Sequence, residues 1–451
     1  MMTLAHLQQL FDEPLSSDLL SADRSIAGVC IDSRQVKPGQ VFVAIQGDTF
    51  DGHDFILQAV NQGAIAVICS RMVSGIDVPQ WIVPDTLTAL AAIATFYRQQ
   101  HTCAVIALTG SNGKTTVKEM IAAILPQPAF ATRGNFNNHI GVPLSVLALQ
   151  PEHRYAVFEL GANHAGEIAL TVAIVKPQVT LVNNIAPAHL EGFGSIEGVA
   201  EAKGEIHQGL ISGGTAVIND DDAFAQFWDS SLAGKTTLHF SLDKPADVHA
   251  DSVTFNPQGC PCFLLITPQG AAWVELRVPG IHNVRNALAA AACTTALNID
   301  LSDIVAGLSA FGGVAGRMTY LPGKHNALII DDTYNANLRS TLTAIDVLGQ
   351  RTGRRIFVFG DMGELGSMSQ QHHQEVGEAV RAHGIDMLLT CGTQSQWATK
   401  GFGDPAQHYS TQDSLIQDLL PLLDDTTTVL VKGSRSSAME YVVRQLLAEA
   451  S

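Results

Sequence analysis

The segment 109–116, Thr-Gly-Ser-Asn-Gly-Lys-Thr-Thr, carries the residue types that bind nucleotide phosphates. Its two glycines allow backbone N–H groups to approach phosphate oxygens near the positive end of a helix. Lys114 is placed to reach the β- and γ-phosphates, and the Thr115 hydroxyl is a ligand for Mg²⁺. Leu108 stands where the longer G-x-x-x-x-G-K-[ST] pattern has its first glycine, and an ordinary glycine-rich turn is the alternative interpretation. The residues expected to contact the nucleotide here are Gly110, Ser111, Asn112, Gly113, Lys114, Thr115 and Thr116.

Three further side chains are candidate metal ligands. Glu159 ends the apolar run 155–158, at the edge where parallel sheets bind ligands, and is either a Mg²⁺ ligand or a capping glutamate. His189 follows the next apolar run and is either a ligand or a structural histidine. Lys203 fills the missing position of an apolar stripe on the helix predicted over 196–210. A desolvated, neutral amine there can react with CO₂ to form an anionic carbamate ligand, whereas an amine at the edge of the stripe would extend to solvent.

The elements that must position these side chains alternate between strand and helix. Alternating strands and helices predict a doubly wound, mostly parallel sheet, and turn signals within 236–279 predict an antiparallel appendage. Helices over 282–298 and 302–311 close this unit, and the glycines of 312–316 predict a hinge. The strand-length apolar runs of the unit lie at 104–108, 155–161, 179–186 and 214–219.

Two smaller α/β units flank the central one. Residues 1–84 predict a small domain with strands at 28–31, 40–45 and 64–69 and one helix near 55–61. Ser33 and Arg34 in it form either a diphosphate or sugar site or a polar turn with a surface salt bridge. Residues 314–451 predict a Rossmann-like domain with strands at 327–331, 355–359, 387–390 and 428–431. The expected domains are therefore 1–84, 85–313 and 314–451, all of α/β class.

Bulk composition limits the functional classes. The 451 residues are 46% apolar and 15% charged, which is typical of a well-packed enzyme of several domains. A net charge of −17 argues against non-specific nucleic-acid binding. Seven cysteines, mostly within apolar runs, and no recognisable signal peptide or membrane span predict a cytoplasmic protein without membrane insertion.

Several segments together resemble the Mur ligase family, the ATP-dependent amide-forming enzymes of cell-wall precursor synthesis. ELGANHAGEI, AHLEGFGS and YNAN favour members that join D-alanyl-D-alanine to UDP-N-acetylmuramoyl-tripeptide, and the D-N-P-R motif of the diaminopimelate-adding members is absent. The resemblance implies an acyl-phosphate intermediate and the products UDP-N-acetylmuramoyl-pentapeptide, ADP and phosphate. The matching segments are TGSNGKTT (109–116), NFNNHIGVP (135–143), FELGANHAGEI (158–168), NNIAPAHLEGFGS (183–195), EAKGEI (201–206), GIHNVRNALAA (280–290), DDTYNAN (331–337), GDMGELG (360–366) and VKGSRSSAME (431–440).

The resemblance also implies roles for the matching residues. Lys114 and Thr115 would serve the ATP phosphates and a first Mg²⁺ with Glu159, and His189 with a carbamylated Lys203 would hold a second Mg²⁺. Lys114, His189 and Lys203 would be the catalytic residues. The other nucleotide contacts would be Asn283, Asn286, Arg317 and Asp331. The contacts to the substrates would be Ser33, Arg34, Asn135, Asn137, Asn138, Tyr334, Asn335, Asn337, Lys432, Ser434 and Arg435.

The expected partners are small molecules, and the chain is expected to act as a monomer. Leu338 stands where many relatives carry proline, so the expected dipeptide loop departs from the family pattern. Two other classes remain open: another amide ligase of the superfamily, such as a folylpolyglutamate synthase, and a nucleotide-dependent switch protein that forms no amide bond.

Overall fold

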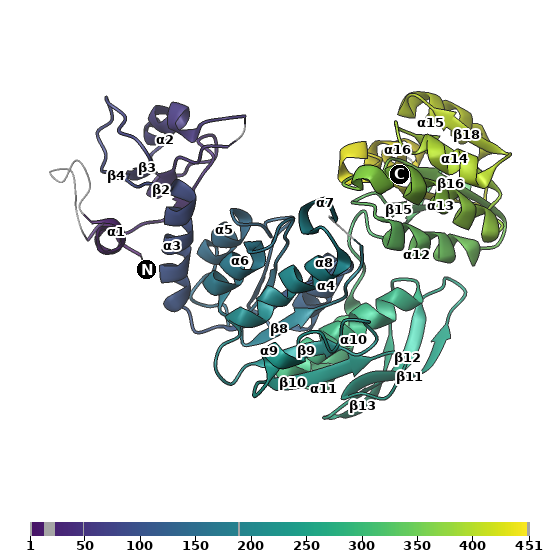
Figure 1. Ribbon diagram of the computed structural model, residues 1–451, viewed down its shortest axis with the longest axis horizontal. Coiled ribbons are helices and arrows are strands. Elements are labelled where there is room, and N and C mark those ends of the chain that lie inside the picture. Colours follow the sequence, from purple (N-terminus) through teal and green to yellow (C-terminus); the bar gives the residue numbers. More distant parts are fainter. Residues whose placement is uncertain (1, 13–22, 48, 188–189, 449–451) are drawn as a thin grey trace.

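The computed structural model describes residues 2–12, 23–47, 49–187 and 190–448, and it contains three sheets that form three α/β units along the chain (Figure 1). The expected three-domain α/β architecture is therefore confirmed. None of the helices in the described ranges combines the length and apolar composition that a membrane span requires.

The first unit is a four-stranded sheet of order β1-β2-β3-β4 in which all pairings are parallel. Helix α1 and strand β4 are absent from the sequence-based expectation, because such short segments show few repeats of a periodic pattern. The elements are α1 (Leu4–Phe11), β1 (Gly28–Cys30), β2 (Gln40–Val43), a 3₁₀ turn (Gly52–Phe55), α2 (Ile56–Asn61), β3 (Ala66–Cys69) and β4 (Gln80–Ile82).

Helix α3 (Thr86–Gln99) connects the first unit to the central one (Figure 1). Leu90 and Ile93 pack into the core of the first unit, whereas Ala94 belongs to the core of the central unit. One helix thus contributes to two cores and couples the first sheet to the second.

The central unit is a nine-stranded sheet of order β13-β12-β11-β10-β9-β8-β5-β7-β6. Side chains of β5 alternate between its faces: Ile106 and Leu108 pack with α4 and α10, whereas Val105 and Ala107 pack with α5, α6 and α8. Both faces are covered, as the apolar runs predict. The elements are β5 (Ala104–Thr109), α4 (Lys114–Ile124), β6 (Ala129–Ala131), α5 (Gly141–Leu147), β7 (Tyr155–Glu159), α6 (Glu167–Val175), β8 (Val179–Val182), α7 (Leu190–Phe193), α8 (Ile196–Gly204), a 3₁₀ turn (Glu205–Gly209), β9 (Thr215–Asn219), α9 (Asp229–Leu232), β10 (Thr236–Ser241), β11 (Val248–Phe255), β12 (Pro261–Thr267), β13 (Gly270–Glu275), α10 (Ile281–Ala296) and α11 (Leu301–Ala310).

The expectation of an antiparallel appendage over 236–279 is only partly right. The β11–β12 and β12–β13 pairings are antiparallel, but β10 pairs in parallel with both β9 and β11. All four strands continue the same nine-stranded sheet. The alternation within a strand indicates which face is buried, but it carries no information about the direction of the neighbouring strand.

The third unit is a six-stranded sheet of order β14-β15-β19-β16-β17-β18, in which only β14 is antiparallel to its neighbour. Helices α12, α13 and α14 cover one face, and α15 and α16 cover the other. Figure 1 shows α12 on the side that faces the central unit. The edge strands β14 and β18 are absent from the sequence-based expectation. The elements are β14 (Thr319–Pro322), a 3₁₀ turn (Lys324–Asn326), β15 (Leu328–Asp332), α12 (Leu338–Gly349), β16 (Arg354–Phe359), a 3₁₀ turn (Gly366–Met368), α13 (Ser369–Ala382), β17 (Met387–Cys391), α14 (Gln396–Phe402), β18 (Ala406–Tyr409), α15 (Gln412–Leu419), a 3₁₀ turn (Leu420–Leu422), β19 (Thr427–Lys432), a 3₁₀ turn (Arg435–Ser437) and α16 (Glu440–Leu446).

Candidate active site

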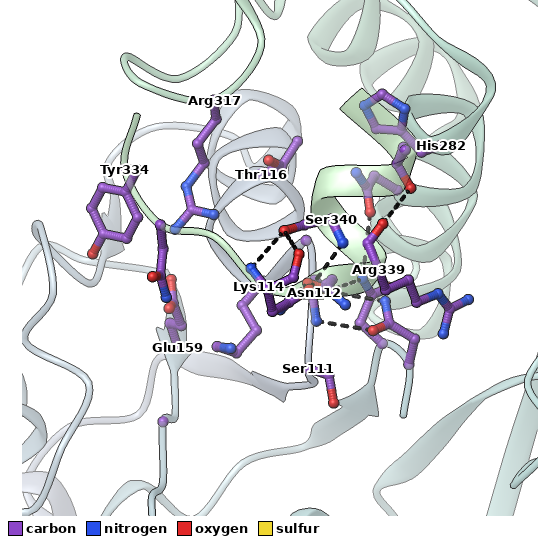
Figure 2. A pocket seen from close by; sticks show the side chains of 18 of the residues that line it. Ser111, Asn112, Lys114, Thr116, Glu159, His282, Arg317, Tyr334, Arg339 and Ser340 are labelled. Atoms are coloured by element: carbon purple, nitrogen blue, oxygen red, sulfur yellow. Dashed lines mark hydrogen bonds between the residues drawn. The ribbon is translucent and has the colours of Figure 1, made fainter. Parts of the chain in front are cut away.

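A cleft of about 780 Å³ lies between the central and third units, and the loop between β5 and α4 forms part of its wall (Figure 2). The structure brings most of the predicted site residues together in this cleft. Those that line it are Ser111, Asn112, Gly113, Lys114, Thr116, Asn135, Asn137, Asn138, Glu159, Asn283, Asn286, Arg317, Tyr334, Asn335, Asn337 and Lys432. The predicted residues of the described ranges that do not line it are Ser33, Arg34, Gly110, Thr115, Lys203, Asp331, Ser434 and Arg435.

The glycines of the loop are required by its backbone and by its close packing. Gly113 has φ +76°, and a Cβ there would lie 2.5 Å from Asn286 Oδ1 and 2.7 Å from Asn183 Nδ2. Helix α4 begins at the next residue, Lys114. The sequence therefore places the N-terminus of an eleven-residue helix directly in the cleft wall.

The backbone of the loop is partly committed to other protein groups. Ser111 N–H donates to Asn184 O, and Asn112 N–H donates to Asn184 Oδ1, both at 2.9 Å. The first N–H groups of α4 have no partners within the helix, so this terminus is where an anion would be bound. Lys114 Nζ donates to Gly110 O at 2.7 Å. Burial lowers the pKa of the Lys114 amine; Glu159 opposes this shift, and Arg317 reinforces it.

Glu159, at the end of β7, is 3% exposed and is held by two side chains. Its Oε2 accepts a hydrogen bond from Thr115 Oγ1, and its Oε1 accepts one from Asn137 Nδ2, both at 2.9 Å. Thr132 Oγ1 accepts from Glu159 N–H at 3.1 Å, and the buried Lys118 donates to Thr132 O at 2.7 Å. The carboxylate is therefore fixed against the start of α4.

The oxygen atoms of Thr115 and Glu159 fit a magnesium ion. Mg²⁺ prefers oxygen ligands and is usually bound through one or two carboxylates together with substrate phosphates. The structure shows no cluster of three or more His, Cys, Asp or Glu side chains able to bind a metal by themselves within residues 2–12, 23–47, 49–187 and 190–448. His189, a predicted ligand, lies outside the described residues.

Lys203 lies on the inward side of α8 and is 1% exposed, as its position on the apolar stripe predicts. Its Nζ lies 5.8 Å from the centroid of the Phe193 ring. Burial lowers the pKa of this amine well below its usual value, and the nearby Lys114 lowers it further. Both effects shift this amine toward its neutral form, which is the form that reacts with CO₂.

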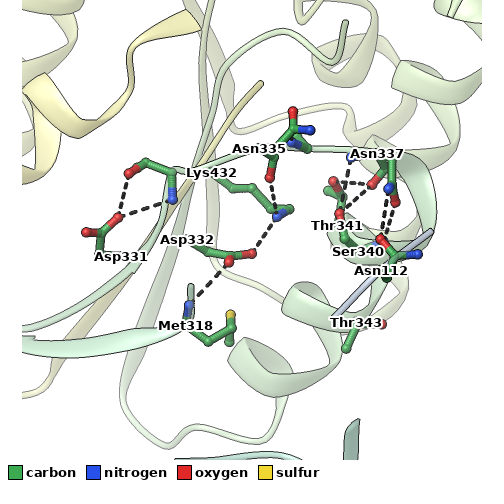
Figure 3. Close-up of polar contacts among 12 residues, drawn as sticks. Asn112, Met318, Asp331, Asp332, Asn335, Asn337, Ser340, Thr341, Thr343 and Lys432 are labelled. Atoms are coloured by element: carbon green, nitrogen blue, oxygen red, sulfur yellow. Dashed lines mark hydrogen bonds and ion pairs between the residues drawn. The ribbon is translucent and has the colours of Figure 1, made fainter. Parts of the chain in front are cut away.

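Two of the cations that the third unit contributes to the cleft are predicted site residues, Arg317 and Lys432. Arg317 Nη2 lies 2.9 Å from Thr115 Oγ1, and the guanidinium carbon lies 4.2 Å from the Tyr334 ring centroid. Lys432 Nζ forms an ion pair with Asp332 Oδ2 at 2.5 Å and donates to Asn335 O at 2.9 Å (Figure 3). Burial raises the pKa of the Asp332 carboxyl, although its contact with Lys432 opposes that shift.

The two adjacent aspartates at the end of β15 point in different directions. Asp331 Oδ1 accepts hydrogen bonds from Thr333 N–H and Oγ1, and Figure 3 shows it turned away from Lys432. Asp332 is the one that lines the cleft. The strand alternation places Asp332 on the face of Ile330, which packs with α12, and Asp331 on the face of Ile329, which packs with α15 and α16.

The predicted substrate residues outside the cleft have local partners. In the first unit, Ser33 Oγ donates to Gln58 Oε1, and the exposed Arg34 pairs with Asp32. In the third unit, Arg435 pairs with Glu440. The Ser434 hydroxyl is within hydrogen-bond distance of the Ser436 and Ser437 hydroxyls.

The lining residues that lie outside the sequence-based predictions include His282, Asp332 and Arg339. His282 stands next to the predicted Asn283 at the start of α10, and burial lowers its pKa to about 4. Arg339 Nη1 donates to Ile185 O of the central unit at 3.0 Å. A contact between residues so far apart in the sequence gives no local signal.

Comparison with known proteins agrees with this geometry. Three family models match: the Mur ligase family, catalytic domain over 25–98, the Mur ligase middle domain over 108–294, and the Mur ligase, glutamate ligase domain over 316–435. The chain belongs to the Mur ligase family. It is 46% identical over 445 residues to UDP-N-acetylmuramoyl-tripeptide–D-alanyl-D-alanine ligase of Escherichia coli strain K12, covering 98% of each chain.

Solved structures of Mur ligases also match this chain over most of its length. A crystal structure of MurF from Acinetobacter baumannii matches with a TM-score of 0.92 and 37% identity, covering 98% of each chain. MurF ligase from Thermotoga maritima in complex with ADP matches with a TM-score of 0.81 and 29% identity, covering 93% of this chain and 96% of the other.

Proposed function

We propose that this chain joins D-alanyl-D-alanine to UDP-N-acetylmuramoyl-tripeptide at the expense of ATP, giving UDP-N-acetylmuramoyl-pentapeptide, ADP and phosphate. The observation that carries the proposal is the cleft itself. One space is lined by the phosphate-binding loop, by the buried Glu159 and by Arg317 and Lys432 of the third unit. Full-length similarity to ligases of this name supports the choice of substrates.

ATP is the nucleotide that the proposal places in the cleft. The N-terminus of α4 and Lys114 would hold its β- and γ-phosphates, and Asn283 and Asn286 would lie beside the base. A relative of known structure binds ADP, which supports this assignment. A magnesium ion held by Thr115 and Glu159 would withdraw charge from the phosphates.

The chemistry proceeds in two steps. A carboxylate oxygen of the tripeptide attacks the γ-phosphorus, the bond to ADP breaks, and an acyl phosphate forms. The amine of the dipeptide then attacks the acyl carbon, loses a proton, and displaces phosphate. Lys114 and Arg317 are placed to offset the negative charge that develops on the transferred group.

We also propose that the three units divide the substrates. Residues 1–84 would hold the UDP end through Ser33 and Arg34, and residues 85–313 would hold ATP. Asn135, Asn137 and Asn138 of the central unit would contact the rest of the UDP-linked substrate. Residues 314–451 would hold the dipeptide, with Tyr334, Asn335, Lys432, Ser434 and Arg435 as its contacts.

A second metal site is proposed at His189 and a carbamylated Lys203. The carbamate carbon–nitrogen bond would form when the neutral Nζ attacks CO₂ and loses a proton. The burial of Lys203 and the direction of its pKa shift support this step. We further propose a cytoplasmic monomer, because ATP and a UDP-linked precursor are cytoplasmic metabolites and one chain supplies the whole cleft.

The test combines phosphate release with product mass. The chain is given ATP, Mg²⁺ and UDP-N-acetylmuramoyl-tripeptide, with D-alanyl-D-alanine, with single amino acids, or with glutamate and a folate in place of the UDP substrate. A mass gain only with the dipeptide supports the proposal. Joining of a single amino acid would show that the chain is a Mur ligase with a different substrate. Slow phosphate release without any joining would favour a nucleotide-dependent switch protein.

A further inference from the structure

We propose that Asn112 and Asn337 form a latch that holds the third unit against the phosphate-binding loop, so that Asn337 positions the two units and does not contact the dipeptide. Asn337 Nδ2 donates a hydrogen bond to Asn112 Oδ1 at 2.8 Å (Figure 3). This inference rests on the proposed function, because its consequence concerns the acyl phosphate.

The central-unit end of the latch is held rigidly. Asn112 N–H donates to Asn184 Oδ1 at 2.9 Å, and Asn112 O accepts from the side-chain amides of Asn183 and Asn184 at 2.9 and 3.0 Å. Both polar groups of the Asn112 peptide are thus fixed by the residues that follow β8. Its Nδ2 is buried and has no partner among the described residues, so Oδ1 makes the side-chain contact.

The third-unit end is held equally well. Asn337 is the N-cap of α12: its Oδ1 accepts from Ser340 N–H at 2.9 Å, and its N–H donates to Ser340 Oγ at 3.1 Å. The cap uses the only side-chain acceptor of Asn337 and turns Nδ2 toward Asn112. A side chain fixed in this way loses little conformational entropy when the contact forms.

The latch differs from the contact that Arg317 makes between these units. Arg317 contacts Thr115 Oγ1, which is a proposed metal ligand, so bound substrates would change the partners of that pair. The asparagine pair is neutral, and the Asn112 N–H is already committed to Asn184. The latch can therefore stay closed while ATP phosphates occupy the start of α4.

Closure matters because an acyl phosphate reacts with water. Attack by water returns the tripeptide carboxylate and releases phosphate, so ATP is spent and no amide forms. A closed cleft excludes that reaction until the amine arrives. Each amide formed also releases one phosphate, so the phosphate released in excess of amide, per amide formed, measures the loss of closure.

Three variants and a control test the latch. Asn337→Ser keeps a hydroxyl that can cap α12 but is too short to reach Asn112. Asn112→Ala removes the other partner and keeps the backbone hydrogen bonds of this residue. The variant with both substitutions completes a double-mutant cycle. Arg351→Gln is the control, because its contact of 3.5 Å to Gln258 O also joins the two units but lies outside the cleft and at the limit of hydrogen-bond distance.

The phosphate released in excess of amide, per amide formed, should rise about three- to tenfold in each single variant, as expected for loss of one neutral hydrogen bond. It should rise no further in the double variant, and it should stay at the wild-type value in the control. An unchanged ratio in both single variants, or an equal rise in the control, would overturn the latch. A raised dipeptide KM in Asn337→Ser with a wild-type ratio would also overturn it, by making Asn337 a substrate contact. Failure of the wild-type chain to form any amide would instead refute the proposed function.

Discussion

Arg317 Nη2 lies 2.9 Å from Thr115 Oγ1, so a cation of the third unit meets the hydroxyl at the start of α4 although 202 residues separate them in the chain. The same hydroxyl donates to Glu159 Oε2 at 2.9 Å. Guanidinium, hydroxyl and carboxylate thus form a continuous polar contact across the cleft. Phosphates bound at the start of α4 would enter next to the positive charge of Arg317.

Replacement of Arg317 should reduce the rate of amide formation. Arg317→Ala removes the guanidinium and its stacking on Tyr334, and loss of a hydrogen bond to a charged group costs about 1.5–3 kcal/mol. We expect kcat/KM for ATP to fall about ten- to hundredfold in steady-state assays. Arg317→Lys keeps the charge but loses the planar stack and should lie between the two. Equal activity of Arg317→Ala and wild type would show that this contact has no part in the reaction.

Lys203→Ala should remove most activity, because it removes the proposed carbamate. A metal ligand supplies several kcal/mol of charge stabilisation, so we expect kcat to fall about a hundredfold or more. A short carboxylic acid should restore part of the activity, whereas bicarbonate should not. Nuclear magnetic resonance with ¹³C-bicarbonate should show a carbamate carbon in wild type that is missing in Lys203→Met. Near-normal turnover of Lys203→Ala at limiting Mg²⁺ would rule out a carbamate at this lysine.

Lys118 should stabilise the central unit through its hydrogen bond to Thr132, which in turn contacts Glu159. Its buried Nζ donates to Thr132 O at 2.7 Å and pairs with Glu119 at 2.7 Å. Lys118→Met keeps the aliphatic stem but leaves the carbonyl unpaired, which costs about 1–3 kcal/mol of unfolding free energy. Urea denaturation followed by fluorescence measures this loss. The matched variant Lys37→Met changes an exposed lysine and should unfold as wild type does; equal midpoints for both variants would contradict the prediction.

Stability should fall in mild acid because His207 is buried in its neutral form. Burial lowers its pKa to about 3, with Lys235 acting in the same sense, and its Nδ1 lies 2.9 Å from Thr180 Oγ1. Between pH 6.5 and 3 the unfolded chain binds a proton that the folded chain does not, so the free energy of unfolding decreases as pH falls through that window. The loss should reach a few kcal/mol near the lower end.

Urea unfolding between pH 7.5 and 4.5 measures this effect, and Trp228, which packs edge-on against His207, offers a local fluorescence signal. His207→Asn should flatten the pH dependence, whereas substitution of the exposed His139 by Gln should leave it unchanged. An equal slope in wild type and His207→Asn would assign the acid sensitivity to other groups.

The parts of the site that follow a local pattern could be predicted from the sequence. The apolar run before the glycines predicts β5 and the phosphate-binding loop, and the gap in a helical stripe predicts the inward position of Lys203. The contact between Asn112 and Asn337 could not be predicted, because each residue is an ordinary loop asparagine until the two units are assembled. The two-residue period of β15 places Asp331 and Asp332 on opposite faces, but Ile329 and Ile330 are both fully buried, so the face that meets the cleft is known only from the fold.

The elements of the fold likewise differ in how far a local sequence pattern predicts them. Apolar runs long enough to show a period predict the inner strands, whereas β14 and β18 are short edge strands that give weak signals. The parallel pairing of β10 depends on the crossover through α9, which the residues of β10 do not encode. Leu338 changes little at the start of α12: it is the first residue of that helix, a position that proline and other residues both accept.

Oxygen transfer from the tripeptide to phosphate tests whether the reaction passes through an acyl phosphate. The terminal carboxylate of UDP-N-acetylmuramoyl-tripeptide is labelled with ¹⁸O and incubated with the chain, ATP, Mg²⁺ and D-alanyl-D-alanine. We expect one labelled oxygen in inorganic phosphate for each amide bond formed, because that oxygen bridges carbon and phosphorus in the acyl phosphate. Label in AMP, or amide formation with unlabelled phosphate, would rule out the acyl phosphate.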